Sequence, residues 1–143
     1  MTNSTIVSNQ VKIETTESKL WTLLVDKIRH PEKYISEVLE VEIVSDKDNV
    51  VHRKMLIQRG DGKKTIEELI TWNEDTGTVM FKMINDPVVN GYVVNQILGT
   101  ANDLYLDYTM NWFTKDGSPL PKEQMQIAIT NACEHTKQIV EEQ

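Results

Sequence analysis

The feature that most constrains the fold is a succession of six short segments between residues 38 and 113 in which apolar and polar residues alternate. Side chains along a strand point to its two faces in turn, so this alternation predicts strands with one buried face. Turn-forming stretches such as "KDN", "RGDGK" and "NEDTG" separate the segments, and strands joined by short turns run antiparallel. The predicted strands span residues 38–45, 50–58, 65–72, 78–84, 92–98 and 103–113. The stretch "NDPVVNG" is predicted to be a loop, because Pro87 cannot lie in a paired central strand.

The remaining segments predict one more strand and the helices. Residues 5–14 alternate like a strand. Thr16 or Ser18 can cap the helix that follows, and Pro31 divides this region into two short helices that meet near His30. A long helix over residues 121–141 closes the chain. Its predicted apolar stripe consists of Met125, Ala128, Ile129, Ala132, Thr136, Ile139 and Val140, with Cys133 beside it.

An antiparallel meander needs a cover for one face, and the stripe of the last helix can supply it. The predicted fold class is therefore α+β, with a curved antiparallel sheet of about six to seven strands wrapped around a long C-terminal helix. A chain of 143 residues is expected to form a single domain, residues 1–143.

Charge and composition exclude several classes of protein. The net charge of −7 argues against nucleic acid and against anionic membrane surfaces as partners. No apolar run approaches the roughly 20 residues of a membrane span, so no stable membrane insertion is expected. With one cysteine and no signal-peptide pattern in "MTNSTIVSNQ", the expected location is cytoplasmic. The expected oligomeric state is a monomer or a homodimer.

Glu68 is the residue that fits its segment least well, because in "TIEELITW" it shares a face with apolar side chains. A turn centred on Gly60-Asp61 places Arg53 directly opposite Glu68, and one centred on Asp61-Gly62 places it diagonally. An unpaired carboxylate on a core face is costly, so we expect an Arg53–Glu68 ion pair. It is either a structural pair at a pocket rim or a polar group that orients a ligand's hydroxyl, amine or carboxylate.

Four stretches, "KLWTLLVDKIRHPEKYI", "TIEELITW", "VNGYVVNQI" and "LYLDYTMNW", carry a resemblance to a known superfamily. Together with the order of elements, they resemble the START/Bet v 1-like helix-grip (SRPBCC) superfamily. More closely, residues 5 to 141 resemble the AtaL-like family, long catalogued as a domain of unknown function. The resemblance implies a cavity between the sheet and the long helix that holds small apolar molecules.

The inward faces that converge on this space predict a ligand pocket. Its expected lining is Arg53, Glu68, Trp72, Phe81, Tyr108, Met110, Met125 and Ile129. No two of the three histidines have metal-ligand spacing, so no metal is expected, and no cofactor is implied. Cys133 is interpreted as a small apolar residue of the helix rather than as a nucleophile.

The predicted function is binding of a small hydrophobic or amphipathic molecule in this cavity. The first alternative is an enzyme of the polyketide-cyclase or dehydratase kind, in which Glu68 or Tyr108 serves as general acid or base. The second alternative is a protein-interaction module like a co-chaperone, which an exposed apolar patch would favour.

Overall fold

The computed structural model describes residues 4–143. The strands are β1 (Thr5–Ile13), β2 (Val38–Lys47), β3 (Val50–Arg59), β4 (Gly62–Asn73), β5 (Thr78–Ile84), β6 (Val89–Thr100) and β7 (Asp103–Thr114). The helices are α1 (Glu17–Arg29), the 3-10 helix η1 (Pro31–Lys33) and α2 (Lys122–Glu141). The single domain predicted over residues 1–143 includes residues 1–3, which lie outside the described part.

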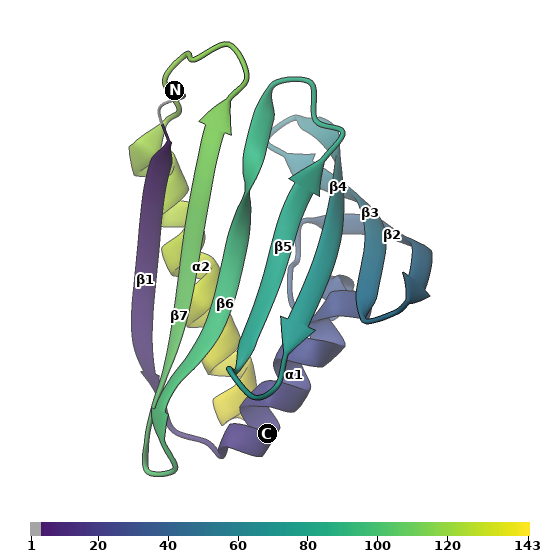
Figure 1. Ribbon diagram of the computed structural model, residues 1–143. Coiled ribbons are helices and arrows are strands. Elements are labelled where there is room, and N and C mark those ends of the chain that lie inside the picture. The colour runs from purple at the N-terminus through teal and green to yellow at the C-terminus, as the bar shows by residue number, and fades with distance from the viewer. Residues whose placement is uncertain (1–3) are drawn as a thin grey trace.

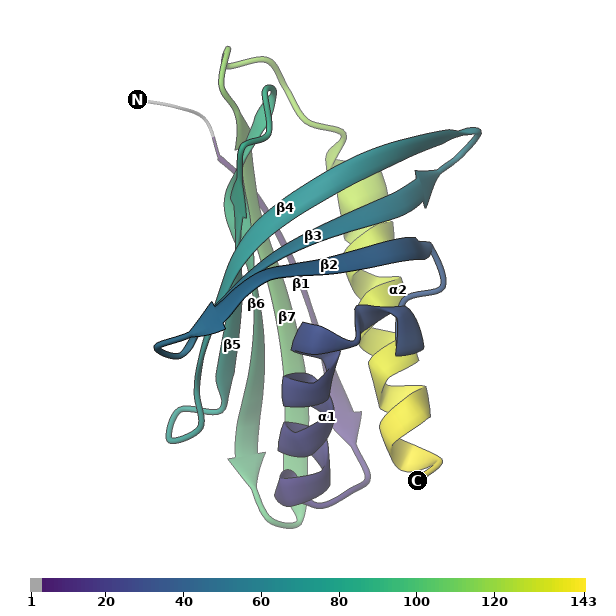
Figure 2. The same cartoon turned by 90° about the vertical axis from the view of Figure 1, so that its right-hand side faces the viewer.

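All seven strands form one antiparallel sheet in the order β1-β7-β6-β5-β4-β3-β2 (Figure 1). Each strand from β2 to β7 pairs with the next along the chain, as the short turns predicted, and β1 returns to pair with β7. The sheet is strongly curled, so that β2, β3 and β4 bend over the side on which both α-helices lie (Figure 2). This arrangement confirms the predicted α+β class with a sheet wrapped around the C-terminal helix.

The short helical region after β1 begins where the sequence predicted. The Thr16 hydroxyl accepts a hydrogen bond from the backbone N–H of Lys19 at 3.2 Å, which caps the first turn of α1. Pro31 occupies the first position of η1, where its missing N–H costs nothing. The second of the two predicted helices is thus a single 3-10 turn of three residues.

The buried face of α2 is rotated about the helix axis relative to the face that the sequence predicted to be buried. Its buried residues are Met125, Ile129, Cys133, Thr136 and Val140. Cys133 therefore lies at the centre of the buried face rather than beside it, whereas Ala128 and Ala132 are exposed. The rotation follows from hydrogen bonds to β1, because Gln126 donates to the carbonyl of Ser8 at 2.8 Å and Cys133 contacts the carbonyl of Asn9.

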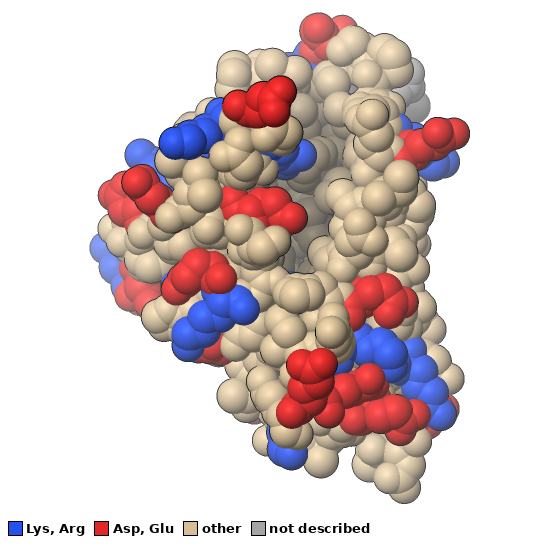
Figure 3. Space-filling view, turned by 180° about the vertical axis from the view of Figure 1, so that it is seen from behind, with Lys and Arg blue, Asp and Glu red and all other residues tan. Residues whose placement is uncertain are grey.

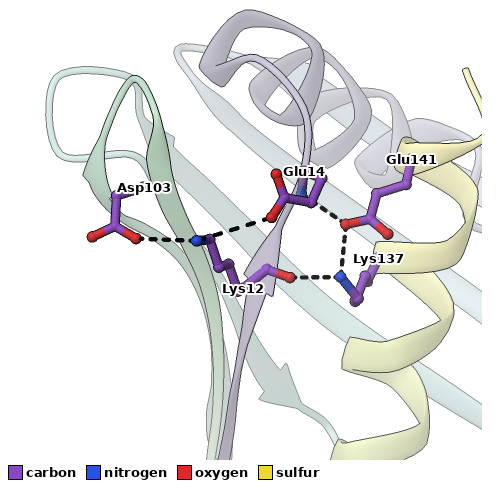
Figure 4. Close-up of polar contacts among 5 residues, drawn as sticks. All are labelled: Lys12, Glu14, Asp103, Lys137 and Glu141. Carbon is purple, nitrogen blue, oxygen red and sulfur yellow. Dashed lines mark hydrogen bonds and ion pairs between the residues drawn. The ribbon is translucent and has the colours of Figure 1, made fainter.

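A group of charged residues fastens the C-terminal end of α2 to β1 (Figure 4). Lys137 donates to the backbone carbonyl of Lys12 and contacts the carboxylate of Glu141, both at 2.7 Å. Glu141 in turn accepts from the backbone N–H of Glu14 at 2.7 Å. Lys12 also pairs with Asp103 on β7 at 3.7 Å. These contacts occupy outward-facing groups of an edge strand, which would otherwise be free to pair with another chain.

Strand β6 begins at Val89, so the prediction of a loop through residue 91 was wrong for its last three residues. Gly91 explains the error, since its φ of +134° suits glycine and its missing side chain lets the backbone of Asn111 and Trp112 approach closely. A glycine between two predicted strands usually indicates a turn, yet Gly91 lies within a strand and permits close strand pairing. The loop itself is shorter and contains Pro87, as predicted.

Within residues 4–143, no helix has the length and hydropathy needed to cross a membrane.

Two isoleucines of α2 provide a matched test of how the helix packs. Ile129 is 3% exposed and lies in the main core, whereas Ile127 is 61% exposed. We expect Ile129→Ala to lower the free energy of unfolding by about 2–5 kcal/mol, because it leaves a cavity under the helix. Ile127→Ala should change it by no more than about 0.5 kcal/mol. Urea unfolding measures both, and equal losses would contradict this packing.

Candidate functional site

A recess opens between α2 and the curled strands β2–β4 (Figure 3). We call it the inner hollow. Helix α1 occupies the concave side of the sheet below it (Figure 2). The inner hollow therefore lies between the sheet and α2, in the place where the sequence predicted a cavity.

The hydrophobic core is divided into two clusters. The main cluster joins α1, α2 and the inner faces of β1 and β5–β7, and includes Val51 on β3 and Ile70 on β4. A smaller cluster lies at the other end of β2–β4 and consists of Val38, Met55, Ile57 and Ile66. Leu20 on α1 and Ile70 are fully buried, but Met110 and Ile66 each keep 9% exposure. A closed, uniformly packed core would join the two clusters, so their separation agrees with a space between them.

Arg53 and Glu68 form the ion pair that the sequence predicted. The turn is centred on Gly60-Asp61, which puts the two residues directly opposite each other on β3 and β4. The Arg53 Nη2 donates to the Glu68 Oε1 at 2.7 Å, and both residues are buried. Glu68 is the more exposed partner, with 12% of its side chain accessible against 3% for Arg53.

The same guanidinium closes the end of α1. Arg53 Nη1 donates to the backbone carbonyls of Lys27 at 3.1 Å and of Ile28 at 2.8 Å. The last carbonyls of a helix have no partner within the helix, and a cation is favourable there because the helix dipole is negative at that end. Arg53 Nε is buried without a hydrogen-bond partner among the described residues.

Lys27 is a site residue that the sequence analysis missed. It lies on the buried face of α1 with 6% exposure, beside Leu20, Leu24 and Ile28. The signal was present, because residue 27 follows Leu24 by three positions and Leu20 by seven, which puts it on the apolar stripe. A lysine at such a position either extends to water or is held inside by polar partners.

The Lys27 ammonium nitrogen reaches the inner face of the sheet. Its Nζ donates to Asn95 Oδ1 at 2.6 Å and to the Tyr108 hydroxyl at 2.7 Å. It also lies 5.4 Å from the ring centroid of Phe81. Burial and, second to it, the nearby positive charge of Arg53 together lower the pKa of Lys27 to about 7, against weaker opposing effects of Cys133 and Glu68.

Tyr108 connects Lys27 to α2 through a second hydrogen bond. Its hydroxyl lies 2.7 Å from the Thr136 hydroxyl, which donates to the carbonyl of Ala132 at 3.0 Å. Because the Thr136 proton is used in that bond, Tyr108 donates to Thr136 and accepts from Lys27. Burial raises the pKa of Tyr108, so the phenol stays neutral. We call these connected side chains the buried polar cluster: Lys27, Arg53, Glu68, Asn95, Tyr108 and Thr136.

The predicted pocket residues all face the concave side, but they fall into groups. Arg53, Glu68, Phe81 and Tyr108 meet around Lys27, and Met110, Met125 and Ile129 belong to the main core cluster. Trp72 packs against the edge of the main cluster, half-buried and with the guanidinium of Arg29 over its ring. That these residues line a ligand pocket remains a prediction.

Two other hollows lie on the outer surface. One, of about 460 Å³, runs along the outward side of α2 from Asn131 to Glu141, and one of about 370 Å³ lies over β2–β4 near Glu42 and Leu56. Neither includes a predicted pocket residue. Within residues 4–143, no group of three His, Cys, Asp or Glu side chains is placed to hold a metal ion.

A family model described as "Acetylaranotin biosynthesis cluster protein L" matches residues 2–142. The chain belongs to the AtaL family. This confirms the resemblance inferred from the sequence. No curated protein matches the chain.

Solved structures show the fold that this AtaL-family chain shares with other proteins. Ara h 8.0201 is 14% identical, with a TM-score of 0.78 over 99% of this chain and 100% of its own. TTHA0849 from Thermus thermophilus is 13% identical, with a TM-score of 0.77 over 94% and 96%. The ZhuI aromatase/cyclase from a Streptomyces species is 13% identical, with a TM-score of 0.71 over 96% and 88%. The Bet v 1-like helix-grip fold is thereby confirmed.

The Arg53–Glu68 pair of the AtaL-family chain should show strong energetic coupling. Arg53→Met leaves Glu68 without its partner and uncaps α1, and Glu68→Gln removes the charge that balances the guanidinium. Each change should cost about 3 kcal/mol or more, and the double variant should recover at least about 1 kcal/mol. Urea unfolding of the four proteins measures the coupling.

The matched control is the exposed pair Arg29–Asp46, whose atoms lie as close, at 2.6 Å. Its coupling should be much smaller, because solvent screens exposed charges. Additive losses at Arg53 and Glu68 would show that the buried pair contributes no mutual stabilisation.

Lys27 should make the stability of the AtaL-family chain depend on pH. Its folded pKa of about 7 lies below the ordinary lysine pKa of 10.5, so between these values the unfolded chain binds more protons. Stability should therefore rise by about 1–2 kcal/mol from about pH 7 to about pH 8.5. An unfolded cysteine begins to ionise only at the upper end of this range, so Cys133, whose folded pKa is raised to about 11, offsets no more than about 0.4 kcal/mol of the rise.

Lys27→Met should remove this rise, whereas Lys82→Met, at an exposed position, should retain it. Denaturant unfolding at a series of pH values is the measurement. A rise of the same size in Lys27→Met would mean that another group titrates.

Proposed function

We propose that this protein binds a small apolar or amphipathic molecule in the inner hollow, with the apolar part against the sheet and α2. The observation that carries the proposal is an open recess on the concave side of the sheet (Figure 3), the side on which the two apolar clusters and the buried polar cluster also lie. Ligand pockets have this composition, because apolar walls supply affinity and a small number of polar groups fix orientation.

The flank of α2 that faces away from β1 supports this proposal. Gln126 and Lys137 mark the flank that bonds to β1. Ala128 and Ala132 lie on the opposite flank by the helical period, and both are exposed. Small side chains at these positions leave room beside the helix, where larger ones would enter the hollow.

Glu68 is the polar group best placed to meet a ligand. Its Oε1 accepts from Arg53, and its side chain retains more exposure than that of its partner. An anchored carboxylate of this kind can accept a hydrogen bond from a ligand's hydroxyl or amine. This favours the interpretation in which the ion pair orients a ligand. The structural interpretation would hold if removal of the Glu68 carboxylate leaves ligand affinity unchanged.

The uncharged fluorescent probe N-phenyl-1-naphthylamine tests the proposal. We expect its fluorescence to rise on binding to the wild-type protein, and Ala132→Phe to weaken binding at least tenfold because the ring fills the hollow. Asn131→Phe adds the same ring at the preceding position of α2, on its outward side, and should leave binding unchanged. Absence of binding, or equal loss in both variants, would contradict the proposed site.

A second candidate function is catalysis of the cyclase or dehydratase kind, without a cofactor. The similarity to a structure titled as an aromatase/cyclase favours it. Tyr108 also suits an acid or hydrogen-bond donor rather than a base, because its raised pKa keeps the phenol protonated. Turnover of an aromatic polyketide precursor that Tyr108→Phe reduces, with probe binding retained, would support catalysis over binding alone.

A further inference from the structure

Lys27 is a buried amine without a carboxylate partner. Within residues 4–143, its Nζ forms no ion pair, and its hydrogen-bond acceptors are Asn95 and Tyr108. A neutral amine has two N–H groups and one lone pair, whereas an ammonium group has three N–H groups. The two acceptors match the neutral form, and they leave the lone pair free.

The groups around Nζ also favour the neutral form. Arg53 from β3 is a permanent cation and is already balanced by Glu68 from β4. Tyr108 from β7 stays a neutral phenol, and burial raises the pKa of the Cys133 thiol on α2 to about 11, so it is neutral as well. A lysine that is desolvated next to another cation is the kind of lysine that acts as a nucleophile.

Nζ lies on the concave face of the sheet, the face on which the inner hollow opens. Phe81 and Tyr108, which it contacts, are followed two residues later on the same strand faces by Met83 and Met110. Those methionines retain 5% and 9% exposure. A molecule held in the inner hollow would thus extend toward the amine along these side chains.

We propose that Lys27 is a carbonyl-capturing residue whose Nζ forms an imine with the aldehyde or ketone group of a molecule bound in the inner hollow. This inference rests on the proposed binding function, because the carbonyl reaches Lys27 through the hollow. It adds a covalent step and a ligand class, amphipathic aldehydes and ketones, that binding alone does not require.

The step needs no oxidant or reductant. The Nζ lone pair forms a bond to the carbonyl carbon, and the carbon–oxygen π electrons move to the oxygen to give a carbinolamine. The two hydrogens of the amine are then lost with that oxygen as one molecule of water, and a carbon–nitrogen double bond remains. The Tyr108 hydroxyl, 2.7 Å from Nζ and bonded to Thr136, is placed to pass protons between nitrogen and oxygen.

Reductive trapping tests the proposal. The wild-type protein is treated at pH 7 with sodium cyanoborohydride and either formaldehyde or 3-phenylpropanal, and the modified lysines are located by peptide mass spectrometry. At this pH, an amine with a pKa of about 7 has a neutral fraction roughly a thousandfold higher than an ordinary lysine. We expect both aldehydes to modify Lys27 at least tenfold faster than the exposed Lys82.

The controls separate reactivity from exposure. Lys27→Met should leave the modification rate of Lys82 at its wild-type value, and the urea-unfolded wild-type chain should modify Lys27 and Lys82 equally. If neither aldehyde favours Lys27, or formaldehyde does and 3-phenylpropanal does not, the inference is wrong. Binding of N-phenyl-1-naphthylamine, measured alongside, shows whether the proposed binding function fails too or stands without the covalent step.

Discussion

The guanidinium of Arg53 holds together the part of the molecule on which the candidate site depends. It joins the carboxylate of Glu68 on β4 to the last carbonyls of α1, at distances of 2.7–3.1 Å. A buried guanidinium is costly unless most of its N–H groups are bonded, so the bonds from Nη1 favour an end of α1 at the point where its last carbonyls meet β3. That ending places Lys27 against Asn95 on β6.

The sheet and the central ion pair could be predicted from the sequence because both follow from the two-residue period of a strand. The alternation of apolar and polar residues predicted the strands. Both possible turn positions between β3 and β4 put Arg53 and Glu68 on the same face of the sheet. The structure selects the Gly60-Asp61 turn. Gly91 shows the limit of this reasoning, since a glycine that permits close strand pairing has the same sequence signature as a turn.

The helices were predicted less completely, because an apolar stripe covers a wide arc of the helix surface and the sequence does not fix which part of that arc is buried. Ala128 and Cys133 both fit a stripe on α2, and only the hydrogen bonds to β1 decide which of them is buried. Lys27 was missed because a lysine on a helix is usually solvated, and its partners Asn95 and Tyr108 lie far away in the sequence. The polar groups of such a cluster become recognisable only when the fold brings them together.

The most direct test of the proposed site is methyl NMR of protein labelled with ¹³C at its methionine methyl groups. Met55, Met83, Met110 and Met125 lie on the concave side, and Met80 lies on the outer face of β5. Addition of N-phenyl-1-naphthylamine should shift the first four signals and give nuclear Overhauser contacts from the probe to several of them. A shift confined to Met80, or contacts from the probe to Met80 alone, would place the binding surface outside the inner hollow and contradict the account.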